Sequence, residues 1–148
     1  LGSRVMDLPG VVAIAAEIIA SMGVAERGKT QAGDYLQDDY PSGNDVVLMS
    51  GIFHRESESG GRSLIRRAWD SLQPGGLLIV GDVFTDPGGA GPAFAALFGL
   101  NMMLTAPDGG VHADAAVAEW MRDAGFSGIE IKPFPPPIHH RLVTGVKR

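Results

Sequence analysis

Several short apolar runs in this chain are followed by polar residues whose types suit the recognition of a nucleoside. These residues are Asp7, Asp34, Ser50, His54 and Asp82. In an open α/β sheet, ligands bind beyond the carboxyl ends of the strands, where a carboxylate can accept hydrogen bonds from ribose hydroxyls. A second carboxylate further along can accept from an adenine amino group. A lone strand-end aspartate often only caps the next helix, so the set as a whole predicts a nucleoside site.

The runs that precede these residues are expected to be strands. Asp45–Ser50 and Leu77–Val83 are almost uninterrupted apolar runs, which predicts burial on both faces, as in a parallel sheet. Lys29–Asp34 is polar and suits only an edge strand. The other expected strands are Arg4–Leu8, Ile129–Lys132 and His140–Val146.

Helices are expected between the strands, because apolar residues recur there at helical spacing. We expect the helix over Phe94–Leu104 to be largely buried, and Asp114 to cap the helix that starts at Ala115. Pro74-Gly75-Gly76 is expected to form a turn. The alternation of elements predicts an α/β fold with a mostly parallel sheet and a C-terminal antiparallel hairpin. The other expected helices are Val11–Met22, Arg62–Leu72 and Ala115–Ala124.

The composition argues against several other classes of function. The 12 basic and 17 acidic residues give a net charge of −5 without a basic cluster, so a nucleic-acid partner is not expected. The chain has no cysteine, which excludes disulfides, zinc knuckles and thiol catalysis and suits a reducing cytoplasm. Neither a membrane span nor a signal peptide is expected. His139 and His140 are adjacent on an expected strand and point to opposite faces, so no metal site is expected.

The order of several short motifs resembles a known family. The motifs are Asp7-Leu8-Pro9, Gly33-Asp34-Tyr35, Ile52-Phe53-His54 after the run at Asp45–Ser50, and Pro74-Gly75-Gly76. Over nearly all its length the chain resembles the catalytic domain of class I S-adenosylmethionine-dependent O-methyltransferases, in the branch that methylates small aromatic and polyketide hydroxyls. The resemblance implies one Rossmann-like domain over residues 1–148, S-adenosyl-L-methionine as cofactor and S-adenosyl-L-homocysteine as product. It also implies a small-molecule hydroxyl substrate and a cytoplasmic homodimer for the full-length protein.

The resemblance also assigns roles in binding the cofactor. It implies that Asp7 holds the ribose and that Leu8 packs beside it. Asp34 would accept a hydrogen bond from the adenine amino group, while Tyr35 covers the adenine ring. Ser50 would lie near the methionine part of the cofactor.

His54 matches the position of the family's general base, and Asp82 matches an acid that orients this base. The chemistry agrees with that role. A phenol has a pKa of about 10 and is a poor nucleophile at pH 7, whereas a histidine with an ordinary pKa of about 6.5 can take its proton during attack. Met102 and Met103 fall where the family lines its acceptor pocket, although helical methionines are as often plain core residues.

The chain departs from the family pattern in three places. Arg55-Glu56 follows His54 where the family usually has Asp-Trp, and His112 stands where a second orienting acid is expected. The family's Gly-x-Gly-x-Gly loop after its first strand is not found. We therefore expect the first strand, this loop and the N-terminal helical dimerisation domain to be missing from the chain.

These departures leave alternatives open. The 148 residues are part of a longer protein, or the sheet closes across the gap, or a swapped partner fills it. Besides an enzyme, the sequence allows a non-catalytic cofactor-binding or dimerisation remnant of the same fold. A nicotinamide dehydrogenase fragment would share the ribose acid, but neither Tyr35 nor Tyr40 has a lysine four residues later.

Overall fold

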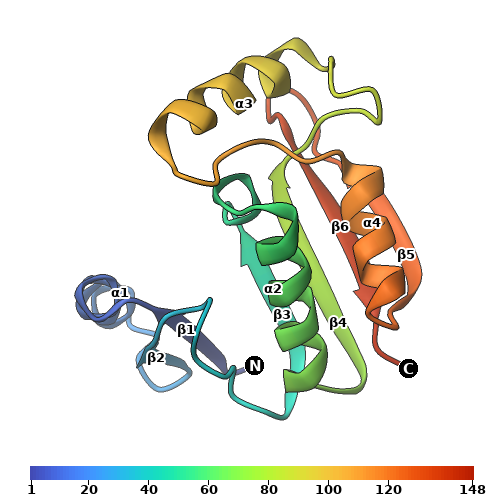
Figure 1. Cartoon of the computed structure of the whole chain (residues 1–148). Helices are drawn as coiled ribbons and strands as arrows, with labels where there is room; N and C mark the ends of the chain where they lie inside the picture. The colour runs from blue at the N-terminus through green and yellow to red at the C-terminus, as the bar shows by residue number, and fades with distance from the viewer. The chain divides into compact units, whose positions relative to one another are not determined.

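The computed structural model describes all 148 residues, and the chain divides into two compact units, Leu1–Tyr40 and Pro41–Arg148 (Figure 1). No helix in either unit is long and apolar enough to cross a membrane.

The first unit is a strand–helix–strand unit. Strand β1 (Ser3–Asp7) leads into helix α1 (Pro9–Ser21), which returns to strand β2 (Gly28–Ala32). The two strands are parallel and in register from Ser3 opposite Gly28 to Asp7 opposite Ala32. Pro9 starts α1, where its missing N–H costs no hydrogen bond. The expected strand, helix and polar second strand are confirmed.

The second unit contains a mixed four-stranded sheet in the order β3-β4-β6-β5. Strands β3 and β4 are parallel, and β6 is antiparallel to both β4 and β5, which confirms the α/β fold with a C-terminal antiparallel hairpin. The strands are β3 (Asn44–Ser50), β4 (Leu72–Val83), β5 (Ser127–Pro133) and β6 (His140–Val146).

The expected turn at Pro74-Gly75-Gly76 lies inside strand β4 instead. The partner on β4 jumps from Leu72, opposite Asn44, to Leu77, opposite Val46, so the intervening residues bulge out of the ladder. Gly75 has φ +83°, a left-handed conformation that glycine adopts without steric cost. The Pro-Gly-Gly motif thus bends one strand and does not separate it from the preceding helix.

Two helices cover one face of this sheet. Helix α2 (Glu58–Ser71) and helix α4 (Asp114–Asp123) contact each other; α2 also contacts β4, and α4 contacts β5 and β6 (Figure 1). Helix α2 begins four residues before its expected start because the Ser57 hydroxyl accepts a hydrogen bond from the Gly60 amide. The fully buried core between these layers includes Leu64, Ile65, Leu78, Val80, Val117, Met121 and Val143.

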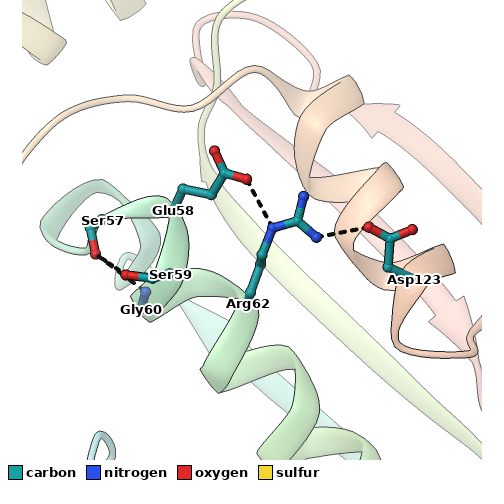
Figure 2. Close-up of polar contacts among 6 residues, drawn as sticks. All are labelled: Ser57, Glu58, Ser59, Gly60, Arg62 and Asp123. Carbon is teal, nitrogen blue, oxygen red and sulfur yellow. Dashed lines mark hydrogen bonds and ion pairs between the residues drawn. The ribbon is translucent and has the colours of Figure 1, made fainter.

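A cation bridges the exposed rims of α2 and α4, as Figure 2 shows. The Arg62 guanidinium donates to Glu58 on its own helix at 2.9 Å and to Asp123 of α4 at 2.7 Å. These hydrogen bonds, the one to Asp123 foremost, raise the pKa of Arg62 above its ordinary value. The three side chains are well exposed, so water and salt screen the pairs and they add little to stability.

Two expectations about burial were wrong. In β3 only Met49 is buried, whereas Val46 is 50% and Leu48 is 64% exposed. Side chains alternate along a strand, and the helices of this unit cover only one face of its sheet. Helix α3 (Ala93–Thr105) buries only Ala95, because it lies beyond the end of the sheet and not upon it (Figure 1).

Asp114 does not cap α4 as expected. It is the first residue of the helix, after Ala113, and no side chain caps this end. Its carboxylate instead accepts a hydrogen bond from Arg141 of β6 at 2.5 Å. The Asp114 carboxylate therefore pairs with a guanidinium and does not accept a hydrogen bond from the first amides of α4.

Candidate active site

A short turn after β3 carries His54 to the carboxyl end of the parallel pair β3 and β4. Ser50 ends β3 opposite Gly81, and the Gly51 amide donates to the Gly81 carbonyl at 2.9 Å. The 3-10 helix η1 (Phe53–Arg55) follows, and it is anchored by Phe53, whose side chain is fully buried. Asp82 comes directly after Gly81 in β4, so Asp82 and His54 lie at the same end of the parallel pair.

His54 and Asp82 form a hydrogen-bonded pair in which the carboxylate is buried and the imidazole is half-buried. The His54 Nδ1 atom lies 2.8 Å from Asp82 Oδ1, with the carboxylate 1% and the imidazole 17% exposed. The same carboxylate accepts from the Val83 amide at 2.7 Å and from the His54 amide at 3.3 Å. A carboxylate only accepts, so Nδ1 carries a proton, and in the neutral ring Nε2 then keeps its lone pair. This is the geometry of a base held in one tautomer by a buried acid.

Helix α3 presents an aromatic residue to the His54 ring. The Phe98 ring meets the imidazole edge to face at a centroid distance of 5.1 Å, and Phe94 stacks on Phe98 at 6.0 Å. Met102 is four residues beyond Phe98, on the same side of the helix, and is half-buried. Met103 is 67% exposed and lies on another side. Of the two expected pocket residues, Met102 therefore shares a face with the ring that touches His54.

The loop before α4 holds the backbone around His54. The Gly110 amide donates to the His54 carbonyl at 3.0 Å, and the His112 Nε2 atom lies 2.9 Å from the Glu56 carbonyl oxygen. From the sequence, His112 was notable only because it stands where the family pattern has an acidic residue. Its contact with a backbone carbonyl 56 residues away could not be found from spacing.

Arg141 of β6 joins the start of α4 to the segment that follows β4. Its guanidinium donates to Asp86 at 2.7 Å and to Asp114 at 2.5 Å, and it is 20% exposed. The hydrogen bond to Asp86 is the largest cause that raises the pKa of Arg141 above its ordinary value. Sequence reasoning missed this cluster, because its members are far apart in the sequence: Asp86 follows β4, Asp114 starts α4 and Arg141 lies in β6.

In the first unit, Asp7 and Asp34 lie at the carboxyl ends of β1 and β2. Asp7 Oδ1 accepts from the Leu8 amide at 2.7 Å, and the Asp7 carbonyl accepts from the Gly33 amide at 2.9 Å. Both oxygens of Asp34 already accept hydrogen bonds, from the Leu36 amide and from the Gln37 side chain, each at 2.9 Å. The two acids are thus neighbours at one edge of the β1–β2 pair.

The carboxylate acceptors at this edge of the β1–β2 pair fit the hydroxyl and amino donors of a nucleoside. Asp7 is half-buried and uses only Oδ1 within the chain, which leaves Oδ2 for hydroxyl donors. Leu8 is 51% exposed beside it, as an apolar neighbour of a ribose would be. Asp34 mainly stabilises its own turn, where the Tyr40 hydroxyl also donates to the Tyr35 carbonyl at 3.0 Å. An adenine amino group would share the Asp34 oxygens with the chain.

The structure thus groups the expected site residues by unit. Asp7, Leu8, Asp34 and Tyr35 lie together in the first, and Ser50, His54, Asp82, Met102 and Met103 belong to the second. Within the second unit, His54 and Asp82 are in direct contact, and Ser50 is exposed at the end of β3.

The chain is similar to methyltransferases along nearly all of its length. A sequence model of the O-methyltransferase domain matches residues 2–127. The chain is 38% identical, over 99% of its length, to the 3-hydroxy-5-methyl-1-naphthoate 3-O-methyltransferase of Streptomyces sahachiroi, and it covers 42% of that protein. It is 30% identical, over 87% of its length, to the tetracenomycin polyketide synthesis 8-O-methyl transferase TcmO of Streptomyces glaucescens, and covers 38% of it.

A solved structure gives the same result. The apo form of the S-adenosylmethionine-dependent methyltransferase SibL matches 99% of the chain with a TM-score of 0.90 and 33% identity, and the chain covers 43% of it. The chain therefore spans about two-fifths of the length of these relatives. Its motif order, its fold and the domain match over residues 2–127 agree, and the chain belongs to the O-methyltransferase domain family.

Proposed function

We propose that the full-length protein transfers a methyl group from S-adenosylmethionine to a hydroxyl of a small aromatic or polyketide-type compound. Membership in the family and the named activities of the Streptomyces relatives support this reaction class. The observation that carries the proposal is the hydrogen bond between His54 and the buried Asp82 carboxylate, because a hydroxyl acceptor needs a base and this pair supplies one.

His54 is the general base in this proposal. Its Nε2 lone pair takes the proton of the acceptor hydroxyl while the oxygen becomes the nucleophile, and the imidazole becomes positively charged. Asp82 keeps the ring in the required tautomer and stabilises the positive charge through the 2.8 Å contact at Nδ1. Burial of this carboxylate strengthens the interaction, because little water screens it.

The cofactor is assigned to the residues at the strand ends. Asp7 would accept from the ribose hydroxyls with Leu8 beside the sugar, Asp34 and Tyr35 would contact the adenine, and Ser50 would lie near the methionine part. When bound, S-adenosylmethionine supplies an electrophilic methyl group on a positively charged sulfur. Asp7, with one oxygen unused within the chain, is the residue best suited to hold it.

The acceptor is assigned to the side of α3 that faces His54. Phe98 offers an aromatic edge, and Met102, on the same side, offers a polarisable side chain that adapts to a planar ring. Met103 belongs to this proposal only as a secondary contact, because it is well exposed. We also propose that the full-length protein is a cytoplasmic homodimer. The exposed apolar side chains of α3 support only the dimer, as a surface that a second copy could cover.

The decisive experiment is His54→Ala in the full-length protein. We expect kcat to fall by roughly 10²–10⁴, the usual contribution of a general base, while the Kd for S-adenosylhomocysteine stays unchanged. His140→Ala is the matched control, because this histidine is exposed at the start of β6, and it should keep its activity. Full activity in His54→Ala would disprove the assignment of the base. Cofactor binding by the wild type without turnover would favour a non-catalytic binding protein of the same fold.

A further inference from the structure

The turn that carries His54 is held from outside at two backbone carbonyls. We call residues 52–56 the base turn. The Gly110 amide donates to the His54 carbonyl at 3.0 Å, and His112 Nε2 reaches the Glu56 carbonyl at 2.9 Å. Within the turn, the Arg55 and Glu56 amides donate to Ile52 and Phe53, so the external contacts act on a unit that is already rigid. The base turn is thus hydrogen-bonded from outside at two carbonyls, those of His54 and Glu56.

The His112 ring is itself locked in place. It meets the Trp120 ring edge to face, at a centroid distance of 4.9 Å and an angle of 72°. Trp120 is buried in the core on α4, so its ring is a firm support. A ring fixed on one side and hydrogen-bonded on the other has little freedom. The His112 ring therefore links α4, through Trp120, to the base turn, through the Glu56 carbonyl.

The loop that carries His112 is anchored at Thr85, two residues beyond the strand that carries Asp82. The Thr85 amide donates to the His112 carbonyl at 3.0 Å, and the Asp114 amide donates to the Thr85 carbonyl at 3.2 Å. Arg141 binds Asp114, the first residue of α4 after this loop, and Asp86, just after Thr85. The end of β4 thus positions both the acid that holds the His54 ring and the loop that holds the His54 backbone.

We propose that His112 is a positioning residue for His54. Its Nε2–H donates to the Glu56 carbonyl and fixes the base turn, so that the His54 ring meets Asp82 and presents Nε2 in one orientation. The inference rests on the proposed role of His54 as general base. In this chain a histidine that grips the backbone stands where an acid that orients the base was expected, and Asp82 alone contacts the ring nitrogen.

The proposal requires opposite tautomers at the two histidines. His112 must carry its proton on Nε2 in order to donate to a carbonyl, whereas His54 must carry its proton on Nδ1 in order to donate to Asp82. Long-range ¹H–¹⁵N spectra of the labelled wild-type chain, at a pH where both rings are neutral, distinguish these forms. We expect the Nε2–H form for His112. A bare Nε2 at His112 would overturn the proposal without the need for any variant.

Two substitutions test whether the hydrogen bond positions the turn. His112→Phe keeps a ring against Trp120 and removes the donor, whereas His112→Gln places an amide N–H near the position of Nε2. Hydrogen exchange at the Gly110 amide, which is bonded to His54, is the readout that needs no activity. We expect exchange about two- to tenfold faster in His112→Phe, the factor that one hydrogen bond of ordinary net strength represents, and near wild type in His112→Gln.

In the full-length enzyme, kcat should follow the same pattern. His112→Phe should lower kcat roughly ten- to a hundredfold with the KM for the cofactor unchanged, because a small displacement of the base costs rate and not binding. His112→Gln should recover most of this loss. Unchanged kcat in His112→Phe would overturn the inference. An equal loss of kcat in His112→Phe and His112→Gln, with both variants folded, would also overturn it.

Failure of the proposed function would look different. Wild-type protein without methyl transfer, or an active His54→Ala variant, would refute the general base. The tautomer of His112 and the exchange of the Gly110 amide would still report on the contact with the base turn. If His112→Phe does not fold, the wild-type spectrum and the His112→Gln variant decide the question.

Discussion

Asp82→Asn is the most informative single substitution at the His54–Asp82 pair. The change keeps the size and shape of the side chain and removes its charge. In the wild type the carboxylate receives three N–H groups, from His54 Nδ1 at 2.8 Å, Val83 at 2.7 Å and the His54 amide at 3.3 Å. An asparagine that keeps its carbonyl oxygen at the first two must turn its NH₂ group toward the His54 amide, where a donor faces a donor.

The size of the effect follows from the bond that is weakened. A hydrogen bond to a charged group is worth about 1.5–3 kcal/mol, and every 1.36 kcal/mol corresponds to a factor of ten in rate. In the proposed mechanism Asp82 stabilises the imidazolium that forms as the hydroxyl is deprotonated, so the loss falls on the transition state. We expect kcat to drop about 10- to 150-fold with little change in cofactor affinity.

The assay is the initial rate of methyl transfer by the full-length protein to an aromatic hydroxyl, with the Kd for S-adenosylhomocysteine measured in parallel. Asp123→Asn is the matched control, since it makes the same chemical change in an exposed ion pair with Arg62, and it should keep kcat. In a His54→Ala background, Asp82→Asn should cost nothing further, because Asp82 acts through His54. An undiminished kcat in Asp82→Asn, or additive losses in the double variant, would show that Asp82 does not act through His54.

Two further predictions concern the nucleoside edge and the start of α2. Asp7→Asn should raise the Kd for S-adenosylhomocysteine about tenfold or more in calorimetric titration, because ribose hydroxyls lose a charged acceptor, and an unchanged Kd would remove Asp7 from the site. Ser57→Ala should lower the free energy of unfolding by about 1 kcal/mol in urea titration, since the Gly60 amide at the start of α2 loses its cap (Figure 2). Ser59→Ala keeps that bond and should cost less, so an equal loss in both variants would contradict the capping role.

Much of the fold follows from local pattern. Local sequence features favour these elements, because each acts over only a few residues. Examples are the Pro-Gly after β1, the helical spacing of apolar residues in α1 and the apolar run of β3. The same pattern could not set burial. Leu48 and Leu104 are apolar, yet they are 64% and 87% exposed, because burial depends on which face another element covers.

The candidate site divides in the same way. The residue types at the strand ends can be read along the chain, and their order was enough to reveal the family, because that order is a linear pattern. The contact of His54 Nδ1 with Asp82 and that of His112 with the base turn arise only when the chain has folded. These contacts join residues 28 and 56 positions apart. Parallel strand register and the return of the loop before α4 create them, and no periodicity along the chain encodes either.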